Sequence, residues 1–108
     1  MRRLRAPLSE QQKRDLVKEY ALKHNFKIFV ETGTQLGLMV DSSKDIFGQV
    51  YTVELLEVHY VAALKKFANN KNVHLFLGDS AVVLDEILSK IDCSVPILFW
   101  LDAHDHDQ

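Results

Sequence analysis

The chain has 108 residues, of which 47% are hydrophobic and 26% are charged, with a formal net charge of -2. This length allows one domain, and the composition is that of an ordinary globular protein rather than a disordered one. The chain has no general excess of basic residues that would attract nucleic acid and no apolar run long enough to span a membrane, so we expect it to bind neither. Its single cysteine excludes an internal disulfide, so we expect a cytoplasmic protein.

The first expected element is an amphipathic helix over residues 10–24. Ser9 and Gln12 have the spacing of a capping box. Apolar residues then recur at helical spacing among charged ones, at Leu16, Val17, Tyr20 and Ala21. We assign residues 1–25 to this N-terminal helix and residues 26–108 to the domain that follows.

Strands and helices then alternate along the chain. Runs of β-forming residues predict strands at 26–30, 49–53, 73–77 and 95–101. Helical spacing predicts helices at about 36–47, 57–68 and 81–91. Such alternation is typical of parallel βαβ units, so we predict an α/β, Rossmann-like three-layer sandwich with helices on both faces. The almost uninterrupted apolar run at 95–101 predicts a strand covered on both faces, and Cys93 is expected to be buried.

An acidic residue stands at each predicted strand end, and this is the strongest internal pattern in the chain. These residues are Glu31, Glu54, Asp79 and Asp102. In an open parallel sheet, ligands bind beyond the carboxyl ends of the strands. The sequence therefore predicts a ligand site at that edge.

The first strand leads into the segment Val30-Glu31-Thr32-Gly33-Thr34-Gln35-Leu36-Gly37. A strand, a glycine turn and a helix in succession bring backbone N–H groups and a helix N-terminus up to a ligand, although a plain tight turn is the alternative. A carboxylate at Glu31 disfavours a pyrophosphate and suits a cationic ligand, such as one with an ammonium or sulfonium group.

The second and third strand ends also carry candidate binding residues. Glu54 follows Gly33 by 21 residues, an offset that suits a carboxylate accepting both hydroxyls of a ribose, and a solvated strand-end acid is the alternative. Asp79, in Gly78-Asp79-Ser80, can accept from the exocyclic amine of an adenine. Asp79 or Ser80 can also be the N-cap of the following helix.

A cluster of acidic residues and histidines follows the fourth strand, at Asp102, His104, Asp105, His106 and Asp107. Their spacing repeats no recognised metal loop, so we expect no metal site. Asp102 or His104 can act as a general base toward a substrate hydroxyl. A solvated C-terminus is the alternative for residues 105–108.

The order of these motifs resembles the N-terminal half of a class I S-adenosylmethionine-dependent methyltransferase. Residues 30–37 resemble the first motif of that family. Val53-Glu54, Leu77-Gly78-Asp79-Ser80 and Phe99-Trp100-Leu101-Asp102-Ala103-His104 resemble the second, third and fourth motifs. The match covers about residues 26–104, and it departs from the family at Gln35, which replaces the middle glycine.

The resemblance implies that S-adenosylmethionine is bound and that its methyl group passes to an oxygen or nitrogen of an unidentified small-molecule acceptor. The implied cofactor-binding residues are Glu31, Thr32, Gly33, Thr34, Gly37, Glu54, Asp79 and Ser80. Among these, the resemblance places Glu54 at the ribose and Asp79 with Ser80 at the adenine. It places Asp102 near the methionine end or the acceptor, and we take Asp102 and His104 as candidate catalytic residues.

The family's sheet normally continues with further strands, so we expect a domain truncated after its fourth strand, with weak or no catalysis as it stands. With the strand order 3-2-1-4, residues 95–101 form an open edge that invites pairing, and we expect a homo-oligomer through it. One alternative is a nucleotide- or NAD-binding Rossmann protein, which Glu31 and Gln35 disfavour. The other is a non-enzymatic αβ interaction module that pairs through the fourth strand.

Overall fold

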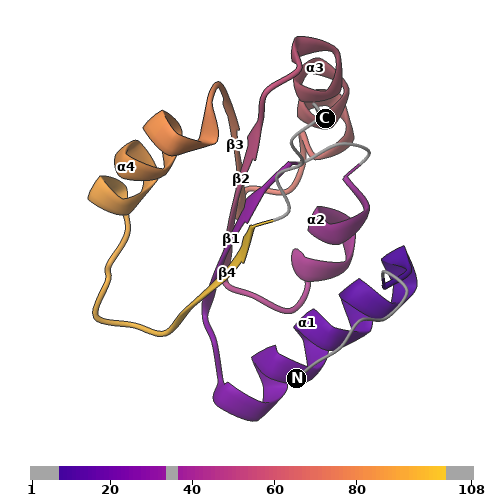
Figure 1. The fold of residues 1–108 in the computed structure, drawn as a ribbon, viewed down its shortest axis with the longest axis vertical. Coiled ribbons are helices and arrows are strands. Elements are labelled where there is room, and N and C mark those ends of the chain that lie inside the picture. The colour runs from indigo at the N-terminus through magenta and orange to yellow at the C-terminus, as the bar shows by residue number, and fades with distance from the viewer. Residues whose placement is uncertain (1–7, 34–36, 102–108) are drawn as a thin grey trace, which may run out of the picture.

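The computed structural model describes residues 8–33 and 37–101. Helices and strands alternate as α1 (Glu10–His24), β1 (Ile28–Thr32), α2 (Leu38–Ser43), β2 (Gln49–Glu54), α3 (Glu57–Lys66), β3 (Val73–Leu77), α4 (Ser80–Lys90) and β4 (Ile97–Leu101) (Figure 1). The strands form one parallel sheet in the order β3-β2-β1-β4. The predicted α/β fold and strand order 3-2-1-4 are confirmed.

α1 begins and ends where the sequence predicts because its caps are local. Ser9 Oγ accepts from the Gln12 N–H at 3.0 Å, and Gln12 Oε1 accepts from the Ser9 N–H at 2.8 Å. Asn25 ends the helix in the left-handed conformation, with φ 56°, and its N–H donates to the Ala21 carbonyl. Both ends of the helix therefore satisfy backbone groups that would otherwise lack partners.

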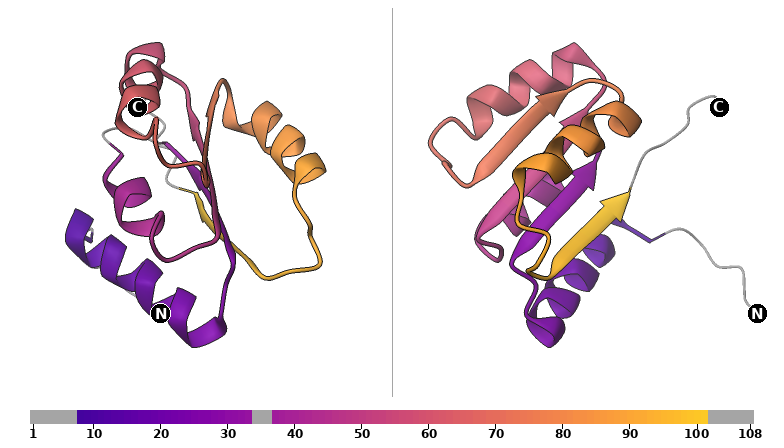
Figure 2. Two further views of the ribbon diagram at one scale, coloured as in Figure 1. Left: turned by 180° about the vertical axis from the view of Figure 1, so that it is seen from behind. Right: turned by 90° about the vertical axis from the view of Figure 1, so that its left-hand side faces the viewer.

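Helices cover both faces of the sheet, as the two views in Figure 2 show. One hydrophobic cluster joins α1, α2 and α3 to the sheet through Val17, Ala21, Phe29, Met39, Val40, Phe47, Val50, Ala63 and Phe67. The other joins α4 to the opposite face through Ile28, Val30, Val53, Val83 and Ile87. Since successive side chains of a strand point to opposite faces, Phe29 and Val30 enter different clusters. This arrangement is the predicted three-layer sandwich.

α2 is shorter than predicted. It ends at Ser43, whose carbonyl accepts from the N–H groups of Ile46 and Phe47 in a tight turn. Short polar residues such as Ser42 and Ser43 favour turns over helix interiors. The turn brings Phe47 into the core, where its ring stacks on Phe29 with centroids 4.9 Å apart.

The first and last strands are shifted relative to the prediction. β1 extends to Thr32, so Glu31 lies within the strand rather than after it. β4 begins at Ile97, two residues later than predicted, because Pro96 has no backbone N–H to donate to the neighbouring strand. The Pro96 carbonyl still accepts from the Lys27 N–H at 3.2 Å, which closes the start of the β1–β4 pair.

The predicted burial of β4 on both faces is wrong for the part of the chain that the structure describes. Phe99 is 42% exposed and Leu101 is 65% exposed, because β4 has β1 on one side and no described strand on the other. Cys93 is also exposed, contrary to expectation, since it lies in the loop between α4 and β4.

Pairing of copies through β4 and truncation of the domain stay predictions. Over the described ranges, no helix has both the length and the apolar character needed to cross a membrane.

Candidate functional site

The carboxyl ends of β1, β2 and β3 lie side by side and bring the predicted binding residues together. In the ladders, Glu31 pairs with Thr52, Thr32 with Val53, and Glu54 with Leu77. The Gly33 N–H donates to the Val53 carbonyl at 2.7 Å, and the Gly78 N–H donates to the Glu54 carbonyl at 2.9 Å. The turns that leave β1 and β3 are therefore both bonded to the end of β2.

Glu31 is a buried carboxylate on this edge, only 3% exposed. The hydroxyl of Thr52, on the neighbouring strand, donates to Glu31 Oε1 at 2.9 Å. Hydrogen bonds are what make a buried carboxylate tolerable, and they also fix its direction. Glu31 thus presents a carboxyl group whose direction is fixed by its neighbour on β2.

Glu54 is the second buried carboxylate, 5% exposed, at the last position of β2. The Leu56 backbone N–H donates to Glu54 Oε2 at 2.9 Å, and Leu56 is the residue from which α3 starts. The start of α3 therefore holds the Glu54 side chain against the strand end. A carboxylate fixed in this way is an acceptor whose geometry is set before a ligand arrives.

The two predicted glycines of the first turn differ in their surroundings. Gly33 has φ 86°, a left-handed conformation in which a side chain is strained, and it turns the chain out of β1. Gly37 has φ 78° and is buried, and a Cβ on it would lie 3.0 Å from the Phe67 ring. Packing against Phe67 is therefore enough to explain why a glycine stands at position 37, with or without a ligand. Thr34 lies outside the described residues.

The residues of the turn after β3 are held by contacts with the start of α4. Gly78 has φ 148°, and a Cβ there would meet Val83 Cγ2 at 3.0 Å. Asp79 is the N-cap of α4, and its Oδ1 accepts from the Ala81 N–H at 2.8 Å. Ser80 is the first helical residue. The N-cap prediction is thus confirmed for Asp79, which stays exposed at the surface.

Residues that the sequence did not single out complete this edge. Thr52 fixes Glu31, and Trp100 pairs with Glu31 from the β4 side. Three leucines around Glu54 are exposed: Leu55, Leu56 and Leu77. The signal for Thr52 was its position two residues before Glu54, which places both side chains on the same face of β2.

Two predicted catalytic residues, Asp102 and His104, lie outside the described residues. Leu101, which precedes Asp102, pairs with Thr32 at the carboxyl end of β1. Thr32 is 2% exposed, and its hydroxyl has no hydrogen-bond partner among the described residues. Within residues 8–33 and 37–101, no group of three metal-binding side chains converges.

Comparison with known proteins bears on the fold. No family model and no curated protein matches the chain. A protein from Klebsiella pneumoniae assigned as an O-methyltransferase has a TM-score of 0.66 at 22% identity, over 90% of this chain and 45% of that one. A protein from Staphylococcus aureus assigned as a caffeoyl-CoA O-methyltransferase gives 0.64 at 21% identity, over 79% of this chain and 43% of that one.

A third similar structure is CalS10, an amino pentose methyltransferase from Micromonospora echinaspora solved with S-adenosylmethionine bound. Its TM-score is 0.55 at 19% identity, over 67% of this chain and 30% of that one. The chain thus spans less than half the length of these three structures. The likeness shows that the chain has the fold of class I S-adenosylmethionine-dependent methyltransferases.

Proposed function

We propose that the chain binds S-adenosylmethionine at the carboxyl edge of its sheet and serves methyl transfer to an oxygen or nitrogen of a small acceptor. The observation that carries this proposal is the pair of buried carboxylates, Glu31 and Glu54, on the central strands. Each is fixed by a hydrogen bond from its surroundings. The fold shared with methyltransferases supports the same assignment.

The two carboxylates match two parts of this cofactor. The methionine end carries a sulfonium and an ammonium, and a buried negative charge at Glu31 attracts such cations more strongly than an exposed one. The ribose offers neighbouring hydroxyls, and the fixed carboxylate of Glu54 is an acceptor for them. A pyrophosphate, as in NAD, would meet repulsion at Glu31, so this edge favours the adenosyl sulfonium over a dinucleotide.

The surroundings of Glu54 suit the nucleoside. The exposed leucines Leu55, Leu56 and Leu77 offer apolar surface for a flat base. We assign Asp79 and Ser80 to the polar edge of the adenine and Thr32, Gly33, Thr34 and Gly37 to the methionine end. When bound, the cofactor supplies an activated methyl group, and the chain's part is to bind and orient it, with Asp102 or His104 as the proposed base.

We also propose a cytoplasmic location. The one cysteine, Cys93, is exposed and unpaired. An exposed thiol is kept in that state most readily in a reducing compartment.

Isothermal titration calorimetry with S-adenosylmethionine, S-adenosylhomocysteine and NAD tests the proposal. We expect heat from both adenosyl ligands and none from NAD. Glu54→Gln keeps the shape of the side chain and removes its charge. It should lower the affinity for both adenosyl ligands about tenfold or more, because hydrogen bonds to a charged acceptor contribute about 1.5–3 kcal/mol.

Glu57→Gln is the matched control for this titration. Glu57 is exposed in the first turn of α3, three positions from Glu54, and its removal should leave both affinities unchanged. An absence of heat from both adenosyl ligands with the folded wild-type protein would overturn the proposed function. Unchanged affinity in Glu54→Gln would overturn the ribose assignment alone.

A further inference from the structure

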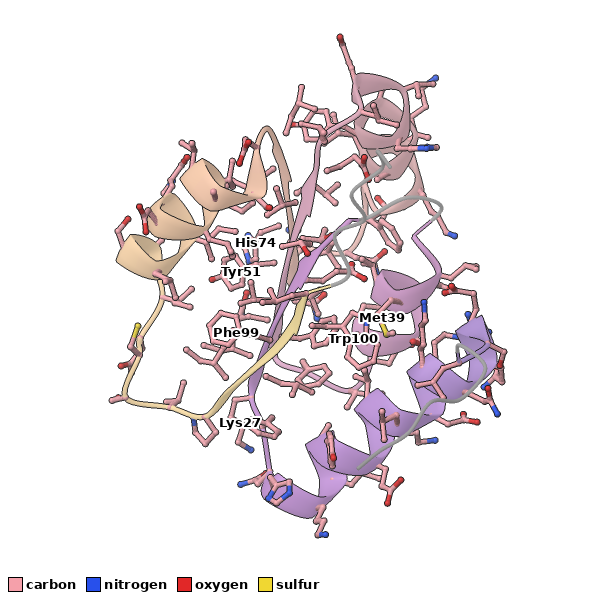
Figure 3. The ribbon with its side chains drawn as sticks, viewed as in Figure 1. Lys27, Met39, Tyr51, His74, Phe99 and Trp100 are labelled. Atoms are coloured by element: carbon pink, nitrogen blue, oxygen red, sulfur yellow. The ribbon has the colours of Figure 1, made fainter. Side chains whose placement is uncertain are left out.

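α3 carries a run of exposed apolar side chains on its outer face. Val58 is 71% exposed, Val61 is 42% exposed and Leu64 is 44% exposed. The opposite face of the helix is the buried one, because Ala63 and the C-cap residue Phe67 belong to the hydrophobic cluster against the sheet. In Figure 3, α3 lies at the margin of the molecule, with side chains directed away from the sheet. The exposed apolar residues of α3 are therefore not part of the core.

These apolar residues lie along one side of the helix, with a charged residue beyond each end. An α-helix turns by about 100° per residue, so Val58, Val61 and Leu64 fall within a sector of about 120°. Glu57 precedes them and Lys65 follows them, both exposed and both within the same sector. Within residues 8–33 and 37–101, neither Glu57 nor Lys65 forms an ion pair. We call these five side chains the α3 stripe.

α4 shows a more usual outer face in the same chain. Val82 is 70% exposed and Leu88 is 37% exposed, and Asp85 lies midway between them on the same side of the helix. The spacing is that of the apolar residues of the α3 stripe, but a charged residue takes the middle place. Covering that face would cost free energy, because the carboxylate of Asp85 would lose its water. The α3 stripe has Val61 in the corresponding place, so it can be covered without that cost.

The α3 stripe is complementary to its own reverse. Val61 is the midpoint, with Val58 and Leu64 three positions away on either side and Glu57 and Lys65 four positions away. Suppose that two copies of α3 pack antiparallel across a twofold axis at Val61. Val58 then lies level with Leu64 of the second copy, and Glu57 lies level with Lys65 of the second copy. Apolar side chains meet apolar ones, opposite charges meet, and the two helix dipoles oppose each other.

We propose that the α3 stripe is the contact surface of a symmetric homodimer in which two copies of α3 pack antiparallel. A second copy is the partner that fits, because a twofold contact brings identical surfaces together and this surface matches its own reverse. The contact removes exposed apolar side chains from water. It involves neither the open side of β4 nor the carboxyl edge of the sheet, so it does not depend on the proposed function.

Sedimentation equilibrium of the 108-residue chain tests the proposal. One short helix makes a small contact, so we expect a monomer–dimer equilibrium with a dissociation constant of about 10–100 µM. Val61→Glu places a charge in the middle of the stripe, as Asp85 does on α4, and should weaken association about tenfold or more. Val82→Glu adds the same charge to the exposed face of α4 and is the matched control, which should associate like the wild type. Circular dichroism should show that both variants are folded.

Charge reversal tests the antiparallel order. Glu57→Lys sets two ammonium groups level with each other, and Lys65→Glu does the same with two carboxylates. Each variant alone should associate about threefold more weakly or worse, in the range of surface ion pairs. An equimolar mixture of the two variants restores both opposite-charge pairs in a mixed dimer, so its association should return to about the wild-type level. Effects of either change on a single helix would not recover in the mixture.

Three results would overturn the proposal. The first is a monomer at every concentration up to about 500 µM. The second is association that Val61→Glu leaves unchanged, and loss of that association in Leu101→Lys would instead assign the contact to the open side of β4. The third is a mixture of Glu57→Lys and Lys65→Glu that associates no better than either variant alone, which would exclude the antiparallel arrangement.

Discussion

Polar residues are usually more exposed than apolar ones, but the inner and outer strands of this sheet show the opposite. The inner strands β1 and β2 bury polar side chains, whereas the outer strands β3 and β4 leave apolar side chains partly exposed. Every residue of β1 is buried, although Glu31 and Thr32 are polar. No residue of β3 or β4 is fully buried, although β4 is entirely apolar. A strand's neighbours therefore decide its burial here, and the buried polar groups lie on the inner strands, where the surrounding packing holds them rigidly.

The largest effect expected from this difference is at Phe29 and Phe99. Phe29 in β1 is fully buried and stacks on Phe47. Phe29→Ala should lower the free energy of unfolding by about 3–5 kcal/mol, because it leaves a cavity in the core. Phe99→Ala in β4 should cost less than about 1 kcal/mol, because this ring keeps much of its contact with water.

Urea unfolding followed by circular dichroism measures both variants against the wild type. The slopes of the transitions should stay alike, so the midpoints compare directly. Equal losses in the two variants would contradict the contrast between inner and outer strands.

The next effect concerns Gly37, the N-cap residue of α2. Gly37 has a positive φ and lies against the Phe67 ring, so Gly37→Ala should cost about 2–3 kcal/mol from backbone strain and crowding. Gly48 precedes β2, and a Cβ there would be 3.6 Å from the Lys27 carbonyl, an ordinary contact. Gly48→Ala should be neutral or stabilise by up to about 1 kcal/mol. Thermal unfolding of both variants distinguishes them, and a mild Gly37→Ala would weaken the packing role given to this glycine.

A smaller effect compares two buried hydroxyls on the inner strands. Thr52→Val removes the donor to Glu31 Oε1 and should cost about 1–2 kcal/mol, because it weakens the support of a buried carboxylate. Thr32→Val removes a buried hydroxyl that has no partner among the described residues, so stability should hold or rise by up to about 1 kcal/mol. Denaturant midpoints are the measurement. A larger loss in Thr32→Val than in Thr52→Val would reverse this assignment.

The sequence predicts most of the fold because its signals are local. The capping box at Ser9 and Gln12 determines where α1 begins, and alternation of strands and helices selects the parallel sheet and its order. Errors occur where tertiary contacts decide. α2 ends early because Phe47 turns into the core, and β4 is exposed because no described strand covers its outer side.

The site is predictable in part for the same reason. Glu31 and Glu54 stand out because a carboxylate in or beside an apolar strand is unusual. Thr52 does not stand out, since threonine is an ordinary strand residue, and its hydrogen bond to Glu31 depends on the register between β1 and β2. Only the pairing of the two strands brings these side chains together.

The smallest effect expected is a pH dependence on the outer strand β3. Partial burial lowers the pKa of His74 below its ordinary value, beside the Tyr51 ring at 4.6 Å and Gln49 Oε1 at 2.6 Å from Nε2. The unfolded chain then takes up this proton at a higher pH than the folded chain. The contribution of His74 to stability is therefore complete above about pH 6.5 and is lost as the pH falls through the lowered pKa.

We expect this loss to stay below about 0.5 kcal/mol, because solvent reaches the partly buried ring of His74 and screens its charge. His74→Gln removes the titrating group, while the other four histidines of the chain remain in both proteins. The difference in unfolding free energy between wild type and variant should thus shift against the wild type between pH 7.5 and pH 5. A difference that is constant with pH would show that β3 does not bury its histidine enough to matter. A difference that favours the wild type at pH 5 would show that the fold raises the pKa of His74, which would contradict the effect assigned to burial.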